Sequence, residues 1–221
     1  MAATLAQRIQ DLVGFDYASN SINTEDEALE TACAEVIDML PDSLLLKYAV
    51  APTTIDSTGP DTDFASEGKK VLRVIRADGG GVFRVCEEVS IDAFEDMKDA
   101  NSLYTPTAHS PIFTLDPQSG TTYLKIFPAI TGGITAKVYN ITYPIGASID
   151  SGEAIAGLPN EVEHAIALKA SLYILQAIIS DTVQDEEDDE MLAMLNNQLQ
   201  SLTAMYGAEM QRLSGEKGEQ S

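Results

Sequence analysis

The chain is poor in the residues from which most catalytic and metal sites are built. It has two histidines, His109 and His164, and two cysteines, Cys33 and Cys86, among 221 residues. Two isolated histidines are too few for a typical zinc site or for a catalytic base held by a partner. No nucleophile motif of the G-x-S-x-G type occurs. The sequence therefore predicts a protein that is not an enzyme and that binds no metal and no cofactor.

Positive charge is also scarce. Thirteen Lys and Arg stand against 35 Asp and Glu, which gives a net charge of −22. The deficit is −9 in residues 1–70, −3 in 71–150 and −10 in 151–221, so both ends are acidic and the middle is nearly balanced. A surface of this sign repels phosphates and anionic lipids, which excludes a sequence-specific reader of DNA. The same repulsion would let DNA slide past without being held.

Leader and membrane-spanning patterns are not found either. Residues 1–14 are polar and amphipathic rather than basic followed by an apolar run, unlike a signal peptide. The apolar run after Ala165 is interrupted at Lys169, and we consider it too short to span a bilayer. Cys33 and Cys86 are far apart and lie within apolar patterns, which favours two reduced core residues.

Helical patterns occupy the two ends of the chain. Residues 1–14 form an amphipathic helix that ends at Gly14, and Thr24 to Glu27 fit a capping box that opens a second helix ending before Pro41. Pro159 suits the first turn of a third helix that runs to about Ile179. A fourth runs from near Asp185 to Leu213, with apolar residues at heptad spacing.

Six consecutive acids, residues 185–190, come before the fourth helix. A calcium loop needs spaced ligands and a glycine in mid-loop, and this run has neither. We interpret it as a solvated helix start that the helix dipole stabilises, with recognition of a partner left open.

From Leu44 to Tyr143 the pattern changes from helical to extended, and residues 44–55 are expected to begin the strands. Residues 71–89 and 111–129 each fit a hairpin, and residues 134–144 fit a final strand. Gly79 to Gly81 are expected to form a hairpin turn rather than a phosphate loop. Ser90 or Asp92 can cap a short helix over 92–100, and residues 57–70 are expected to be a polar loop. At least five strands suggest a small antiparallel sandwich or barrel.

The predicted fold class is α+β. We divide the chain into N-terminal helices (1–43), a β domain (44–145) and C-terminal helices (158–213) packed with residues 1–43 as one helical domain. Residues 214–221 are expected to be a flexible tail.

The third helix raises a question of its own. From Ala165 to Ile179 only Lys169, Ser171 and Gln176 are polar. A helix on the surface of a domain usually has a polar face about as wide as its apolar face. We explain the missing polar face by contact with a neighbouring copy of the same protein.

Two stretches resemble a known family. VLRVIRADGGGVFRVCEEVSIDAFEDMKDA leads through SPIFTLDPQSGTTYLKIFPA to the strand KVYNITYP, and GLPNEVEHAIALKASLYILQA follows with a Leu-Pro and an apolar helix. This succession resembles the head-to-tail adaptor (neck connector) proteins of tailed bacteriophages. The resemblance covers roughly Thr24 to Leu213 and depends on the order of elements as much as on residue identity.

The resemblance implies a structural virion protein, assembled in the host cytoplasm and located in the virion neck. Such adaptors form a ring, expected to be twelve-fold, between the capsid portal above and a tail, nozzle or stopper protein below. The genome passes through the ring without sequence-specific binding, and no membrane is involved. Subunit contacts would then involve Ile166, Leu168, Leu172, Tyr173, Leu175 and Ile179. Portal docking would involve Leu199, Leu202, Met205, Tyr206, Met210 and Leu213.

Three alternatives stay open. The protein could be another neck or tail completion protein of the same apparatus. It could be an acidic DNA mimic that binds a host factor, although the middle region carries little of the charge that a mimic displays. A hydrolase or metal enzyme is the third, because the absence of a motif is weak evidence.

Overall fold

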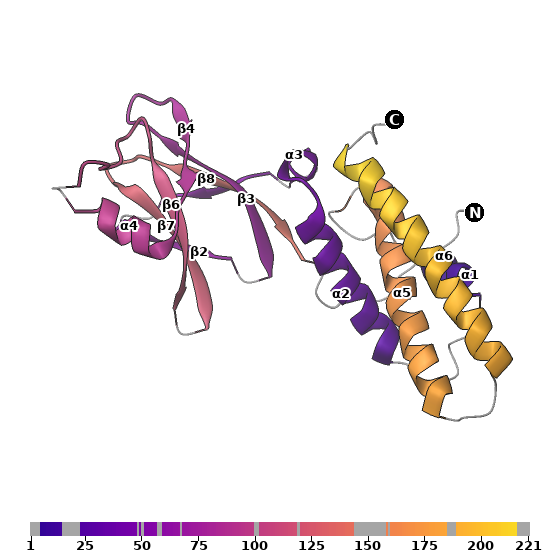
Figure 1. The fold of residues 1–221 in the computed structure, drawn as a ribbon. Helices are drawn as coiled ribbons and strands as arrows, with labels where there is room; N and C mark the ends of the chain where they lie inside the picture. Colours follow the sequence, from indigo (N-terminus) through magenta and orange to yellow (C-terminus); the bar gives the residue numbers. More distant parts are fainter. Residues whose placement is uncertain are drawn as a thin grey trace. The chain divides into compact units, whose positions relative to one another are not determined.

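The computed structural model describes residues 5–14, 23–47, 49, 51–56, 59–66, 68–99, 102–118, 120–143, 158, 160–184 and 189–215. These residues form an α+β fold, as predicted from the sequence (Figure 1). The helices are α1 (Leu5–Val13), α2 (Asn23–Met39), α3 (Asp42–Leu45), α4 (Ile91–Met97), α5 (Asn160–Gln184) and α6 (Asp189–Ser214). The strands are β1 (Thr53–Ile55), β2 (Gly59–Ala65), β3 (Lys69–Ala77), β4 (Phe83–Val85), β5 (Glu87–Glu88), β6 (Ile112–Gln118), β7 (Thr121–Ile130) and β8 (Ala136–Thr142).

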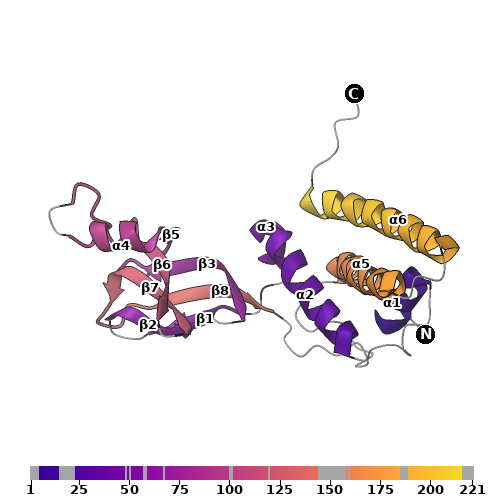
Figure 2. The same ribbon diagram turned by 60° about the horizontal axis from the view of Figure 1, so that its bottom comes forward.

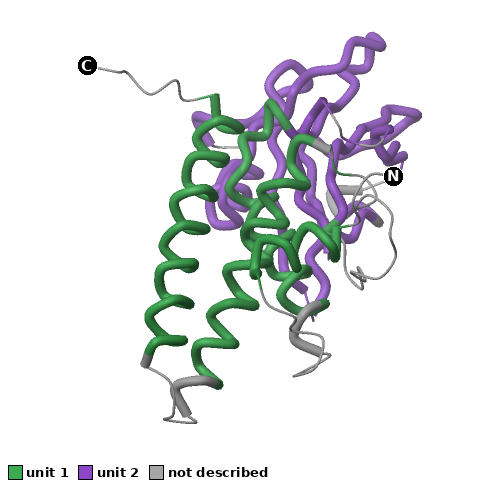
Figure 3. Tube along the Cα trace, turned by 90° about the vertical axis from the view of Figure 1, so that its right-hand side faces the viewer, with its two compact units in different colours: residues 1–44, 143–221 green, residues 45–142 purple. Residues whose placement is uncertain are grey.

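The chain divides into two compact units. One joins residues 1–44 to residues 143–221, and the other is the continuous segment 45–142 between them (Figure 3). We call them the helical unit and the β unit. The helical unit is therefore built from two segments that are distant in the sequence, with the β unit inserted between them.

Helix α5 is the centre of the helical unit. It packs against α1, α2 and α6 (Figure 2), which together cover most of its circumference. A helix that is apolar on all sides is expected in such a central place, because no side of it has to face water. The one fully buried hydroxyl of this segment, that of Ser171, donates to the Ala167 carbonyl at 2.7 Å and so costs little to bury.

Glycines end two of these helices. Gly14 has φ 74° and its N–H donates to the Gln10 carbonyl at 2.9 Å, and Gly215 follows α6 with φ 74°. This left-handed conformation is favourable only for glycine and a few polar residues, so the position of Gly14 fixes the end of α1. The predicted capping box at Thr24 lies partly outside the described side chains.

The β unit consists of two four-stranded sheets. Sheet A has the order β1-β8-β3-β4, and sheet B has the order β2-β7-β6-β5. The two predicted hairpins are present as β3–β4 and β6–β7, and the N–H groups of Gly80 and Val82 donate to Asp78 Oδ1 in the first turn. All pairings are antiparallel except β5 with β6, which is parallel.

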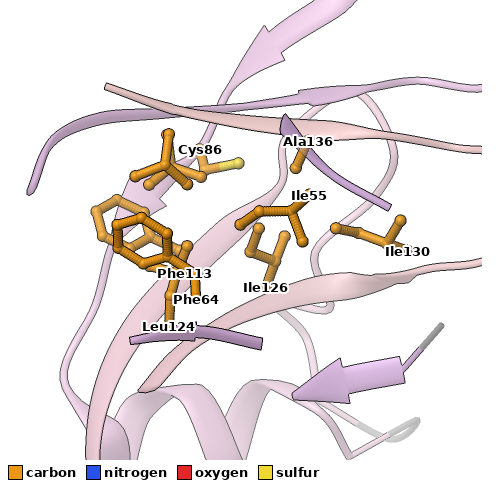
Figure 4. Close-up of a cluster of buried hydrophobic side chains, with 10 residues drawn as sticks. Ile55, Phe64, Cys86, Phe113, Leu124, Ile126, Ile130 and Ala136 are labelled. Carbon is orange, nitrogen blue, oxygen red and sulfur yellow. The ribbon is translucent and has the colours of Figure 1, made fainter. Parts of the chain in front are cut away.

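The core of the β unit lies between its two sheets (Figure 4). Ile55, Val74 and Val138 from sheet A meet Leu124 and Ile126 from sheet B. In β3, β7 and β8 alternate residues are buried in this layer, which is the arrangement of a β-sandwich. Helix α4 begins at Ser90, whose Oγ accepts from the Ala93 N–H at 3.3 Å, and its Phe94 is fully buried.

Two predictions for the β unit were wrong. Residues 59–65, expected to lie in a polar loop, form strand β2, which pairs with β7 through two register shifts. Residues 44 and 45, expected to begin a strand, end helix α3, and the next strand starts only at Thr53. In β2 the polar sequence gives a weak local pattern, and pairing with the distant strand β7 decides the structure.

Candidate interaction surfaces

Four residues predicted to contact a neighbouring subunit are already buried within one chain. Ile166, Leu168 and Leu175 are 0 % exposed and Leu172 is 7 % exposed. The helical unit itself covers them, so their side chains have no exposed surface for a second copy in this structure. Tyr173 and Ile179 are half-buried and remain accessible at their edges.

The burial of α5, and not its length, distinguishes this helix from a membrane-spanning helix. The window Glu161–Asp181 has a mean hydropathy of 1.4 and is long and apolar enough to cross a bilayer, but 61 % of it is buried inside the structure. The prediction that this run is too short to span a bilayer was therefore wrong. Its burial among α1, α2 and α6 is what marks α5 as a core helix.

Helix α6 is docked along the helical unit through one side, which contains its buried leucines. Leu195, Leu202 and Leu213 are 0–8 % exposed. Gln198 Nε2 donates to the Leu12 carbonyl on α1 at 2.8 Å. Near the end of α6, Arg212 Nη2 lies 3.4 Å from the Glu161 carbonyl on α5. Of the residues predicted to dock on a portal, Leu202 and Leu213 therefore serve the core of their own chain, which corrects that assignment.

The other predicted docking residues lie at the surface of α6. Met205 is 43 % exposed, while Leu199, Tyr206 and Met210 are half-buried. Met194, 54 % exposed, lies eleven residues before Met205 and so on the same side of the helix. The Tyr206 hydroxyl lies 3.4 Å from Met39 Sδ of α2, and Met39 is itself 57 % exposed. We call Met194 and Met205 the methionine surface; Tyr206 and Met210 lie roughly 100° and 140° further round α6, and Met39 lies beside Tyr206.

An ion-pair network lies next to Tyr206 and ties three helices together. Lys169 Nζ of α5 is 2.9 Å from Glu35 Oε2 of α2, and it lies 4.8 Å from the Tyr173 ring centroid and 5.4 Å from that of Tyr206. The Tyr173 hydroxyl donates a short hydrogen bond to Glu35. This bond, followed by Lys169, lowers the pKa of Glu35. Lys169, a polar exception of the central helix, thus holds α6 and α2 in place beside the methionine surface.

Every described cation of the helical unit is engaged by a carboxylate of the same unit. Arg8 Nη1 is 3.6 Å from Glu163 Oε2, and Arg212 Nη2 is 2.6 Å from Glu209 Oε1. Lys169 is the third, in its pair with Glu35. The helical unit has 4 basic and 23 acidic residues in its sequence, a net charge of −19. Its unpaired surface charge is therefore almost entirely negative.

A second apolar feature, which the sequence analysis missed, lies in the β unit. Leu103 is 96 % exposed and Tyr104 is 78 % exposed, in the loop after α4. The backbone around them is held in place: the Thr105 hydroxyl donates to the carbonyls of Asp99 and Ser102, and the Tyr104 N–H donates to Ser102 Oγ. A Leu-Tyr pair in a polar loop was the signal that could have found it.

The residues with catalytic or metal-binding chemistry are not brought together. Among the described residues no group of three or more His, Cys, Asp or Glu could hold a metal ion. Cys33 and Cys86 are free and buried, as predicted, and burial raises the pKa of each thiol to about 12. His109 Nδ1 is exposed and lies 3.8 Å from Asp78 Oδ2. Residues 185–188 of the acidic run lie outside the described part of the chain.

No protein-family model matches the chain, and no curated protein sequence matches it either.

Proposed function

We propose that this protein is a structural connector of a tailed bacteriophage: a ring that joins the capsid portal to the tail and encloses the DNA channel. The observation that carries the proposal is the placement of an exposed apolar surface on a terminal helix that is already docked. Lys169, Gln198 and the buried leucines hold this helix in place. Met194 and Met205 are therefore not needed to dock the helix, and they are exposed to solvent.

The methionine surface suits contact with another protein. Methionine side chains are flexible and polarisable, and they adapt to irregular apolar partners. Exposed apolar residues that gather rather than scatter mark interaction sites. In the adaptor proposal the portal covers this surface, and the exposed Leu103 and Tyr104 of the β unit contact the tail side. The strongly negative helical unit keeps passing DNA mobile because it does not attract phosphates.

The decisive variant on α6 must spare its core. Leu202 is 1 % exposed, so Leu202→Asp would bury a charge and disrupt the helical unit whatever the function. Met205→Asp instead adds a charge at the surface. We expect Met205→Asp to reduce binding to the portal at least about ten-fold while the thermal unfolding of the protein stays unchanged.

Gln200→Asp is the matched control, because Gln200 is exposed on the same helix and the substitution adds the same charge. Binding is measured by co-sedimentation of the full chain with purified portal rings, and by the yield of tailed particles in a complementation assay. Equal binding of Met205→Asp and the unchanged protein would refute the role of the methionine surface. A protein that never assembles and never binds a portal would refute the connector itself.

The concentration of negative charge favours one other candidate, an acidic mimic of DNA. A net charge of −19 within the helical unit meets the need for charge gathered in one part of the chain. Recovery of a DNA-binding enzyme from host lysate on the isolated full chain, and its release by added duplex DNA, would support the mimic over the connector.

A further inference from the structure

Sheet A differs from the rest of the chain in its charge. Its four strands contain 6 of the 13 basic residues and none of the 35 acidic ones. Sheet B has the opposite balance, with 5 acidic residues and 1 basic residue. The protein has a net charge of −22, so a sheet whose strands contain no carboxylate is a place where a negatively charged partner can bind.

Strand register assigns these side chains to two faces. Val74 pairs with Val138 and Arg76 pairs with Ala136, and all four side chains are buried on the inner face. The alternate positions therefore point away from the core. Val85, Ile75 and Lys137 form one row across three strands, and Arg73 with Tyr139 and Ala77 with Phe83 form the rows beside it. We call Arg73, Ile75, Phe83, Val85, Lys137 and Tyr139 the outer face of sheet A.

The outer face is both apolar and positive. Val85 is 60 % exposed and Phe83 is 37 % exposed, and Arg73 is exposed beside them. Lys137 Nζ lies over the Phe83 ring, 4.6 Å from its centroid, so its charge is held at the surface of the sheet. Its edge strand β4 pairs only with β3 among the described strands. Apolar side chains with two cations and no carboxylate suit an acidic protein surface.

The complementary surface is present in the same chain. Helix α2 contains six acidic residues and no basic residue. Most of its apolar residues are buried in the helical unit, although Met39 at its end is 57 % exposed. Glu27, Thr31 and Asp38 lie on the exposed side, where Asp38 Oδ1 accepts from the Tyr143 hydroxyl at 2.6 Å. Nucleic acid fits the outer face less well, because a net charge of −22 repels phosphates and because the face is largely apolar.

We propose that the outer face of sheet A in one copy binds the exposed acidic side of α2 in a second copy of this chain. The two surfaces are different, so the contact is heterologous, and repeated contacts of this kind close into a ring or continue into a filament. This inference rests on the proposed ring and identifies its subunit contact. It replaces the contact through α5, whose side chains are covered within one chain.

Cross-linking between two variants of the full chain, each with one added cysteine, tests the contact directly. Val85→Cys and Glu27→Cys are each placed on an exposed side chain, while Cys33 and Cys86 are buried and do not compete. A disulfide is expected when the two variants are mixed under oxidising conditions and not in either variant alone. Asp92→Cys, exposed on α4, replaces Val85→Cys in the control mixture. A mixture that gives no more product than the control, or self-linked Val85→Cys alone, overturns the proposal.

Charge reversal gives a second, independent measurement. Arg73→Glu with Lys137→Glu is expected to weaken self-association at least about ten-fold in sedimentation at about 0.15 M salt, and Glu27→Arg in the same chain is expected to restore much of it. Lys98→Glu, at the C-cap of α4, is the control and should have little effect on association. Unchanged self-association of the double variant overturns the contact. If the double variant also loses binding to duplex DNA, the outer face binds nucleic acid instead of a second copy. In either case normal rings on the portal would leave the connector proposal standing.

Discussion

The helical unit and the β unit differ in their charge and in the way their cores are built. The helical unit has 4 basic and 23 acidic residues, whereas the β unit has 9 basic and 12 acidic residues and a net charge of −3. The helical unit is organised around one apolar helix, and the β unit around a layer between two sheets. The net charge of −22 is therefore not spread evenly over the chain. It is concentrated in one unit, and within the other unit it leaves sheet A without any carboxylate.

The two units also treat their cations differently. The three described cations of the helical unit each face a carboxylate of that unit. In the β unit Arg84, Lys98 and Lys125 also pair with carboxylates, but Lys69 lies over Phe64 and Lys137 lies over Phe83. Arg76 is 3 % exposed, and its Nη1 and Nη2 donate to the carbonyls of Ala77 and Ala129. Cations that face rings and backbone carbonyls keep their positive field. The β unit can therefore attract a negative partner, and the helical unit cannot.

The largest effect is expected from opening one core and not the other. Leu168 and Leu124 are both 0 % exposed, the first in α5 and the second in β7. Either residue changed to Ala should cost about 2–5 kcal/mol of unfolding free energy in its own unit. Cys33 reports on the helical unit and Cys86 on the β unit, since both thiols are buried and have a pKa of about 12.

In Leu168→Ala we expect the rate of thiol labelling at Cys33 to rise roughly 100-fold with Cys86 unaffected, and in Leu124→Ala the reverse. The measurement is mass spectrometry of each cysteine peptide against time. Equal acceleration of both cysteines in either variant would show that the two units open together, and the comparison would then have to be made on the whole chain.

A smaller effect is expected from the ion pair that holds α2, α5 and α6. Glu35→Gln should lower the free energy of unfolding of the helical unit by about 1 kcal/mol, because the Glu35 side chain is partly exposed and solvent screens part of the interaction. The matched change in the β unit is Asp116→Asn, which removes the pair with Lys125 at 2.6 Å. Thermal unfolding followed at Cys33 and Cys86 would show whether each change affects only its own unit.

The same pair predicts a dependence on pH. Tyr173 first, and then Lys169, lower the pKa of Glu35 below its ordinary 4.5. A carboxyl with a lowered pKa stabilises the folded state above its unfolded value and loses that contribution as the pH falls through its folded value. We therefore expect the stability of the helical unit to decrease below about pH 4.5, and to decrease less in Glu35→Gln. An identical acid limb in the two proteins would contradict this role of Glu35.

The smallest effect is expected from salt. Like charges repel within the helical unit, and added salt screens that repulsion over about 10 Å at 0.1 M. Raising NaCl from low concentration to about 0.5 M should stabilise the helical unit by roughly 1 kcal/mol or less and the β unit by less than that. Calorimetry at several salt concentrations would separate them. Equal stabilisation of both units would mean that the charge asymmetry has no energetic consequence.

The sequence alone determined the local features of this protein. Periodicity predicted the helices at both ends, turn chemistry predicted the hairpins at Gly79 to Gly81 and at Gly120, and composition predicted the negative charge of the ends. These follow from residues close together in the chain, so a single sequence contains the information. It also predicted Cys33 and Cys86 as buried thiols, because both lie within apolar patterns.

Only the tertiary structure decided which surfaces are free. The sequence showed that α5 lacks a polar face, and the structure shows that α1, α2 and α6 of the same chain cover it, so no neighbouring copy is needed to explain the missing polar face. The pairing of β1, β8, β3 and β4, which gathers six cations in one sheet, depends on strands that are up to about eighty residues apart. Such pairing is set by nonlocal packing and burial, for which the amino-acid pattern of each segment gives no direct signal.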